Sequence, residues 1–118
     1  FFSKAIEQLP DYGDAYYYYA LALIKGRKPK VLTLTEVKKI EEHLNAAIQI
    51  DNSRAKYYYL WALIKYDFYM KNGLRISPPG IEELIEEGNA KEYDRQEIDK
   101  MLQRVPVNDE ELLSVIRR

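Results

Sequence analysis

The chain has 118 residues, of which 47% are hydrophobic and 31% are charged, so it is long enough to bury a hydrophobic core of its own. Its formal net charge of −1 argues against attraction of the whole chain to nucleic acid or to anionic lipid. It contains no cysteine, which excludes disulfides and thiolate chemistry, and no apolar run approaches the ~20 residues needed to span a bilayer. We therefore expect a soluble, globular protein that does not enter the membrane.

Charge is distributed unevenly along the chain. Residues 1–75 carry 12 basic and 8 acidic side chains, whereas residues 76–118 carry 6 and 11. The sequence starts with phenylalanine instead of methionine and has no recognisable signal peptide. We expect it to be a fragment of a longer, cytoplasmic protein.

The first 73 residues predict four helices, from start and stop signals. The first ends before Pro10, and the second runs from Asp14, as its N-cap, to about Lys25. Thr33 or Thr35 caps the third helix, and Thr33 forms a capping box with Glu36. The fourth follows a turn at residues 51–53 and runs to Lys71. The apolar face of the third helix is expected to contain Val37, Ile40, Leu44, Ala47 and Ile48.

Three shorter helices are predicted after Gly73. Ser77 caps the first, with Pro78 at its first helical position and Gly88 at its end. A capping box of Asp94 and Glu97 starts the second, and a third begins at Asn108 with Glu111. The apolar residues at helical spacing in these helices include Ile81, Leu84, Ile85, Ile98, Met101, Leu102, Val105, Leu112, Leu113, Val115 and Ile116.

An internal repeat is the clearest signal in the sequence. Residues 15–25 (AYYYYALALIK) and 55–65 (AKYYYLWALIK) are identical at 8 of 11 positions, at an offset of 40 residues. Both blocks are apolar on nearly every side, as expected of a helix enclosed by neighbouring helices. A repeat of this length is typical of stacked helical units that bury their apolar faces against one another.

These blocks, with the residues before them, resemble the tetratricopeptide-repeat (TPR) family. The matching positions are Ala5-Ile6, Pro10, Ala15, Tyr16, Tyr19 and Ala20 in the first copy, and Ala47-Ile48, Asp51, Tyr58, Trp61 and Ala62 in the second. Ala replaces the family's Gly at both helix-packing positions, and the turn inside the helix pair, at about residues 26–34, is longer than usual. The resemblance covers about residues 1–71. It implies an all-α fold of antiparallel helix pairs over residues 1–73, with residues 74–118 as short capping helices.

The resemblance also implies a binding surface, since TPR stacks bind peptides or helices along the first helix of each pair. By position, this groove would contain Asp14, Tyr17, Leu21, Ile24, Lys56, Tyr59, Leu63 and Tyr66. Some TPR domains hold a chaperone's C-terminal carboxylate with Lys and Asn at two of these positions. Tyr17 and Leu21 stand there in this chain, and a chaperone carboxylate is therefore not expected as the ligand. We predict a non-catalytic scaffold or adaptor that binds a peptide or a partner domain through apolar or aromatic anchors. The alternative is that most of the tyrosines only pack the core.

Two other functions stay open from the sequence. The loop at residues 25–30 holds four cations in six residues, and Arg27, Lys28 and Lys30 would contact phosphate or an acidic partner unless the loop is simply solvated. No pattern of aromatic residues for stacking bases accompanies the loop, so nucleic acid is the less favoured partner. The last possibility is a structural spacer or a homodimerisation element of a larger protein.

The sequence predicts no catalytic, cofactor or metal site. His43 is the only histidine, and no set of ligands at metal-binding spacing accompanies it. None of the serines lies in a nucleophile motif. One predicted helix contains two like-charged i,i+4 pairs, which we interpret as a solvated acidic face made of Glu82, Glu83, Glu86 and Glu87. We therefore expect a binding protein and not an enzyme.

Overall fold

The computed structural model describes residues 13–24, 26, 31–76, 79–105 and 110–117. These residues form helices and no strand, which confirms the all-α prediction for this part of the chain. The elements are α2 (Gly13–Ile24), α3 (Leu34–Ile50), α4 (Ala55–Ile64), the π-helix η2 (Lys65–Met70), α5 (Ile81–Asn89), α6 (Arg95–Arg104) and α7 (Glu110–Arg117). The helix expected before Pro10 lies outside the described residues.

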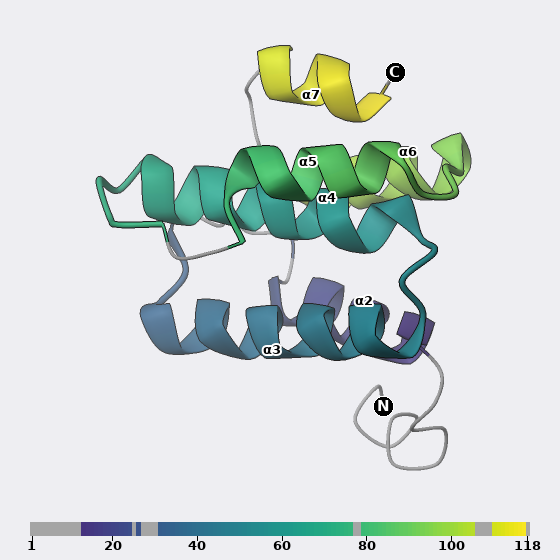
Figure 1. The fold of residues 1–118 in the computed structure, drawn as a ribbon. Helices are drawn as coiled ribbons and strands as arrows, with labels where there is room; N and C mark the ends of the chain where they lie inside the picture. The colour runs from purple at the N-terminus through teal and green to yellow at the C-terminus, as the bar shows by residue number, and fades with distance from the viewer. Residues whose placement is uncertain (1–12, 25, 27–30, 77–78, 106–109, 118) are drawn as a thin grey trace.

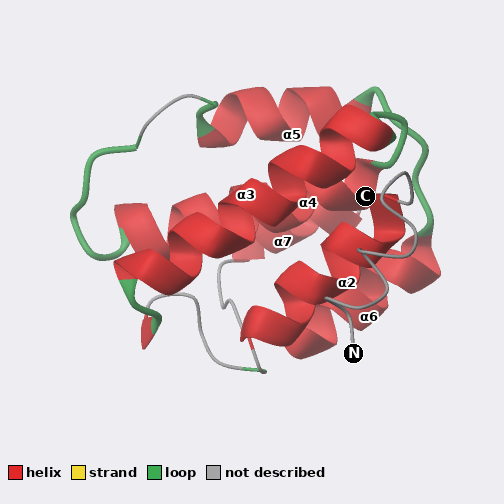
Figure 2. Ribbon diagram, turned by 90° about the horizontal axis from the view of Figure 1, so that it is seen from below, coloured by secondary structure: helices red, strands yellow, loops and turns green. Residues whose placement is uncertain are grey.

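The helices are stacked in layers (Figure 1). α2 and α3 pair at one end of the molecule, α4 and α5 lie above them, and α7 lies at the opposite end. The chain reverses direction from each of the helices α2 to α5 to the next. α6 packs against both α2 and α4, and the view from below shows α2 and α6 overlapping (Figure 2). The C-terminal helices therefore pack on the helices that carry the repeat.

The two copies of the repeated block have different environments. Every residue of α4 is buried, because α3, α5 and α6 surround that helix. α2 buries a single side, made of Gly13, Ala15, Tyr17, Ala20, Leu21 and Ile24. The copies contact each other directly, since the rings of Tyr17 and Tyr57 lie 5.4 Å apart. Nearly identical sequences thus form the central helix of the core in one case and a flanking helix in the other.

Hydrogen bonds from aromatic side chains of the α4–η2 segment connect it to three neighbouring helices. The hydroxyl of Tyr57 donates to Asp14 on α2, and that of Tyr59 donates to Asn89 on α5 at 2.7 Å. Trp61 and Tyr69 both donate to the carboxylate of Glu41 on α3, at 2.8 and 2.6 Å. Burying a tyrosine or tryptophan is favourable when its polar atom keeps a partner. These bonds satisfy that condition.

The predicted N-caps of α3 and α6 are both present. Thr33 and Glu36 form the expected capping box, with Glu36 N donating to Thr33 Oγ1 at 3.2 Å and Thr33 N donating to Glu36 Oε1 at 3.0 Å. Asp94 accepts from the amides of the first turn of α6. The side chain of Glu97, however, bonds to Tyr18 and Lys56 on other helices. The second capping box is therefore only half formed.

The predicted starts of α2 and α5 were wrong, whereas the fourth helix ends within one residue of its predicted end at Lys71. Asp14 is the second residue of α2 and not its cap. The fourth helix is α-helical to Ile64 and continues as a π-helix to Met70. α5 begins at Ile81 with Gly80 as its N-cap, and not at Pro78, which lies outside the described residues with Ser77. Proline disfavours helical geometry at the residue before it, so two consecutive prolines make a poor first turn.

Candidate functional site

The structure buries six of the eight residues predicted to line the binding groove, and Asp14 is half-buried. The exposed fractions of the six are between 0% and 6%, so none of them is an exposed side chain on α2 or α4. Tyr66 is half-buried and reaches the surface. The buried residues are Tyr17, Leu21 and Ile24 on α2 and Lys56, Tyr59 and Leu63 on α4.

The C-terminal helices explain this burial. Glu97 on α6 accepts hydrogen bonds from the Tyr18 hydroxyl at 3.0 Å and from Lys56 Nζ at 3.4 Å. Lys56 Nζ also lies 3.2 Å from the carboxylate of Asp14 and 4.9 Å from the centre of the Tyr17 ring. α5 covers Tyr59 from another direction. The chain's own helices thus occupy the face that the TPR resemblance assigns to a partner.

Arg27, Lys28 and Lys30 lie outside the described residues, so their contact with phosphate stays a prediction.

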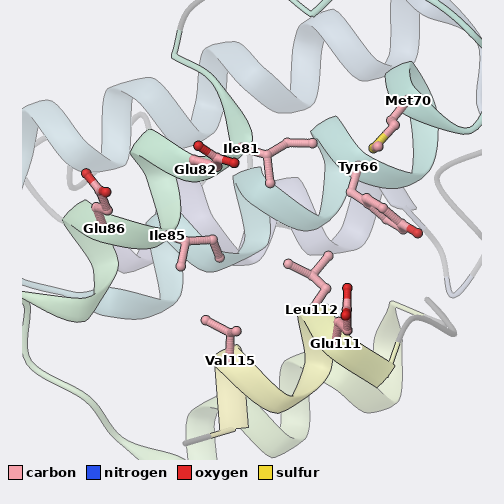
Figure 3. Close-up of a pocket in the computed structure, with 9 residues that line it drawn as sticks. All are labelled: Tyr66, Met70, Ile81, Glu82, Ile85, Glu86, Glu111, Leu112 and Val115. Atoms are coloured by element: carbon pink, nitrogen blue, oxygen red, sulfur yellow. The ribbon is translucent and has the colours of Figure 1, made fainter.

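A hollow lies between η2, α5 and α7, and we call it the α5–α7 groove. Its volume is about 650 Å³. Figure 3 shows aliphatic side chains of α5 and α7 facing one another across it, with the ring of Tyr66 at one end. The residues that line it are Tyr66, Met70, Ile81, Glu82, Ile85, Glu86, Glu111, Leu112 and Val115.

The wall of the α5–α7 groove is apolar and partly open to solvent. Ile81, Ile85 and Leu112 are partly buried against the core, whereas Met70 and Val115 remain 56% and 43% exposed. Single exposed apolar residues are ordinary, but a contiguous apolar patch bounded by polar groups marks an interaction surface. The groove has this composition.

The groove is negatively charged. Three of its nine lining residues, Glu82, Glu86 and Glu111, carry carboxylates, and none of the nine is a lysine or arginine. All three glutamates are exposed, as is the rest of the predicted acidic face. Glu82 and Glu86 lie one turn apart, as do Ile81 and Ile85, so α5 presents an apolar row beside an acidic row.

Two structural features shape the groove. The π-helix places Tyr66 and Met70 at the groove, and its i→i+5 bond runs from Lys71 N to Tyr66 O at 3.1 Å. π-helical turns are often found at functional sites. α7 is anchored at its C-terminal end, where Ile116 is fully buried and its carbonyl accepts from the Tyr93 hydroxyl at 2.8 Å. This anchor leaves the Val115 side of α7 open.

Comparison with protein-family models, curated proteins and solved structures finds no match.

Other kinds of site have little support in the described ranges. His43 donates from Nδ1 to the carbonyl of Lys39 at 2.7 Å and stacks on Tyr19 with ring centres 4.4 Å apart. These ranges contain no cluster of three potential metal ligands among His, Cys, Asp and Glu. None of their helices has the length and apolar character of a membrane span.

The sequence interpretation included one groove residue, Tyr66, among the binding candidates. It assigned Ile81 and Ile85 to the core and regarded the neighbouring glutamates as solvated. The available signal was the strong amphipathic pattern of the last helices. That pattern identifies an apolar face, but it does not indicate whether the chain itself covers that face.

Proposed function

We propose that this chain is a non-catalytic protein-interaction module that binds a basic, amphipathic helix in the α5–α7 groove. The observation that carries the proposal is the combination of exposed apolar side chains, above all Met70 and Val115, with three carboxylates in one hollow. Proteins recognise amphipathic helices by laying the apolar face of the helix into such a groove.

The groove specifies the partner's chemistry. Apolar anchors at i, i+3 or i+4 spacing would contact Ile81, Ile85 and Val115, because these residues form the two walls of the groove. Lysine or arginine beside the anchors would face Glu82 and Glu86, since opposite charges favour encounter and correct orientation. An acidic peptide would meet like charge and bind more weakly.

The TPR resemblance supports an interaction module without locating its surface. The antiparallel pairing of α2 with α3 and of α4 with α5, and the contact between the repeated blocks, are compatible with TPR-like stacking. We propose that α2 to α4 form the TPR-like part and that the partner site is displaced from the predicted groove to the C-terminal face. This displacement follows because α6 fills the position at which a TPR ligand would lie.

The test is titration of labelled helical peptides followed by fluorescence anisotropy. One peptide has leucine anchors flanked by lysine, and a second carries glutamate at the same flanking positions. We expect the basic peptide to bind more tightly and its affinity to fall with added salt. Because exposed ion pairs contribute about 0.2–1 kcal/mol each, reversing two charges in E82K/E86K should weaken binding of the basic peptide by about tenfold at low salt.

The chain provides a matched control on the same helix. E83K/E87K makes the same change of charge on exposed residues of α5 that do not line the groove. Equal weakening by both double variants, or equal affinity for both peptides, would contradict the proposal.

A second copy of the chain is the competing occupant. Sedimentation at several concentrations would detect such a dimer, and V115D should dissociate it. This outcome would show that a second copy of the chain, and not a peptide, is the ligand of the groove.

A further inference from the structure

The two methionines of the chain lie in opposite environments. Met101 on α6 is fully buried in the core, whereas Met70, the last residue of η2, is 56% exposed and lines the α5–α7 groove. A peroxide oxidises a methionine thioether to the sulfoxide only where it reaches the sulfur, so exposure separates the two residues. We therefore expect Met70 to be oxidised in the folded chain while Met101 is protected.

Met70 is also part of the surface that a bound helix would cover. Figure 3 shows it beside the Tyr66 ring, at the end of the groove that η2 provides. Its thioether is apolar and flexible, and such side chains adapt well to the apolar anchors of a partner. Oxidation of Met70 would therefore change the wall of the groove and not the core.

A sulfoxide fits this position poorly when a partner is bound. The sulfoxide oxygen is a hydrogen-bond acceptor, and covering an acceptor with an apolar anchor is unfavourable unless a donor replaces water. The side chains that line the groove beside Met70 are aliphatic or carboxylate, apart from the Tyr66 hydroxyl. Carboxylates are acceptors themselves and provide no donor at neutral pH. The oxidised groove thus loses an apolar contact and gains an acceptor for which its walls provide one hydroxyl at most.

We infer that oxidation of Met70 to its sulfoxide weakens the binding of a helix in the α5–α7 groove; this inference rests on the function proposed above. In the reaction, the O–O bond of hydrogen peroxide breaks as one oxygen atom bonds to the sulfur, which loses two electrons, and the other oxygen leaves as water. Hydrogen peroxide carries no charge, so the carboxylates of Glu82, Glu86 and Glu111 do not repel it. Oxidation is also linked to occupancy, since a bound helix covers Met70.

The test combines peptide mapping by mass spectrometry with the anisotropy titration. After treatment of the full chain with hydrogen peroxide, we expect one added oxygen on Met70 before any on Met101. The oxidised chain should bind the basic helical peptide about tenfold more weakly, the loss expected when a methionine contact is removed from an apolar surface. Its circular dichroism spectrum should not change, because Met70 lies outside the core. Peptide present during the treatment should slow the oxidation of Met70.

Two variants at the same position serve as controls. M70L keeps an apolar side chain of similar volume but has no sulfur, so peroxide should leave its affinity where it stood before treatment. M70Q places a polar group of similar length at the position and should bind the peptide as weakly as the oxidised chain, without peroxide.

Equal oxidation of Met70 and Met101 in the folded chain would overturn the inference. So would an unchanged affinity after Met70 is oxidised, or an equal loss of affinity in peroxide-treated M70L. Each of these outcomes leaves the helix-binding function intact. Absence of peptide binding by the untreated chain would instead overturn the proposed function, and this inference with it.

Discussion

Gly88 lies where α5 approaches the central helix most closely, and G88A tests that packing. A Cβ atom built at Gly88 would lie 2.5 Å from Cε1 and 2.8 Å from Cδ1 of Tyr59. These distances are far below van der Waals contact. The ring is fully buried, and its hydroxyl donates to Asn89, so it has little freedom to move. The added methyl group must therefore displace α5 or force the ring from its preferred rotamer.

Two opposing effects set the magnitude. Replacing glycine by alanine inside a helix is worth about 1 kcal/mol of stabilisation. Overpacking a core costs about 1–3 kcal/mol. We expect a net loss of about 1 kcal/mol in the free energy of unfolding, measured by urea denaturation followed by circular dichroism at an unchanged m-value.

A double-mutant cycle with Y59L isolates the steric effect. Leucine lacks the ring atoms that clash with the new methyl group, so G88A should become stabilising, by up to about 1 kcal/mol, in the Y59L background. Stabilisation by G88A in the otherwise unchanged chain would refute the close packing of α5 on α4.

Three further predictions concern caps, charge and pH. T33A removes the N-cap of α3 and should cost about 1 kcal/mol in urea unfolding; no loss would show that the cap is dispensable. K56M keeps an apolar stem of similar length but leaves the carboxylates of Asp14 and Glu97 without their cation. It should reduce the free energy of unfolding by about 2 kcal/mol and so lower Tm. An unchanged Tm would contradict this prediction. Burial raises the phenol pKa of Tyr57 as well as that of Tyr17, so stability should be complete below the unfolded pKa of about 10 and fall as the pH rises above it. Y17F should reduce that alkaline slope by up to about 1.4 kcal/mol per pH unit.

The sequence predicts local structure well where a local interaction determines it. The Thr33–Glu36 capping box and the turn at residues 51–53 depend on residues within four positions of each other, and both are present. The π-helix was not predicted, since nothing in the pattern of residues 65–70 distinguishes it from an α-helix. Its buried Lys65 finds the carboxylate of Glu41 on another helix, a pairing that no local signal reveals.

Burial and surface features depend on how distant segments pack. Tyr17 and Tyr57 occupy equivalent positions of the repeat, yet only Tyr57 has a hydroxyl partner among the described residues. The Tyr57 hydroxyl donates to Asp14 on another helix, and the repeated sequence does not specify that pairing. The α5–α7 groove likewise depends on how far α7 stands from α5. The helical spacing of Leu112 and Val115 does not specify that distance.

The Lys56 ammonium group has a consequence for how the chain assembles. One of its carboxylate partners, Asp14, comes before Lys56 in the sequence, and the other, Glu97, comes 41 residues after it. During synthesis from the N-terminus, α2 and α4 are complete long before α6 can supply that charge and cover their shared tyrosine face. The ion-pair cluster around Lys56 is therefore complete only after α6 has been synthesised and has packed against α2 and α4.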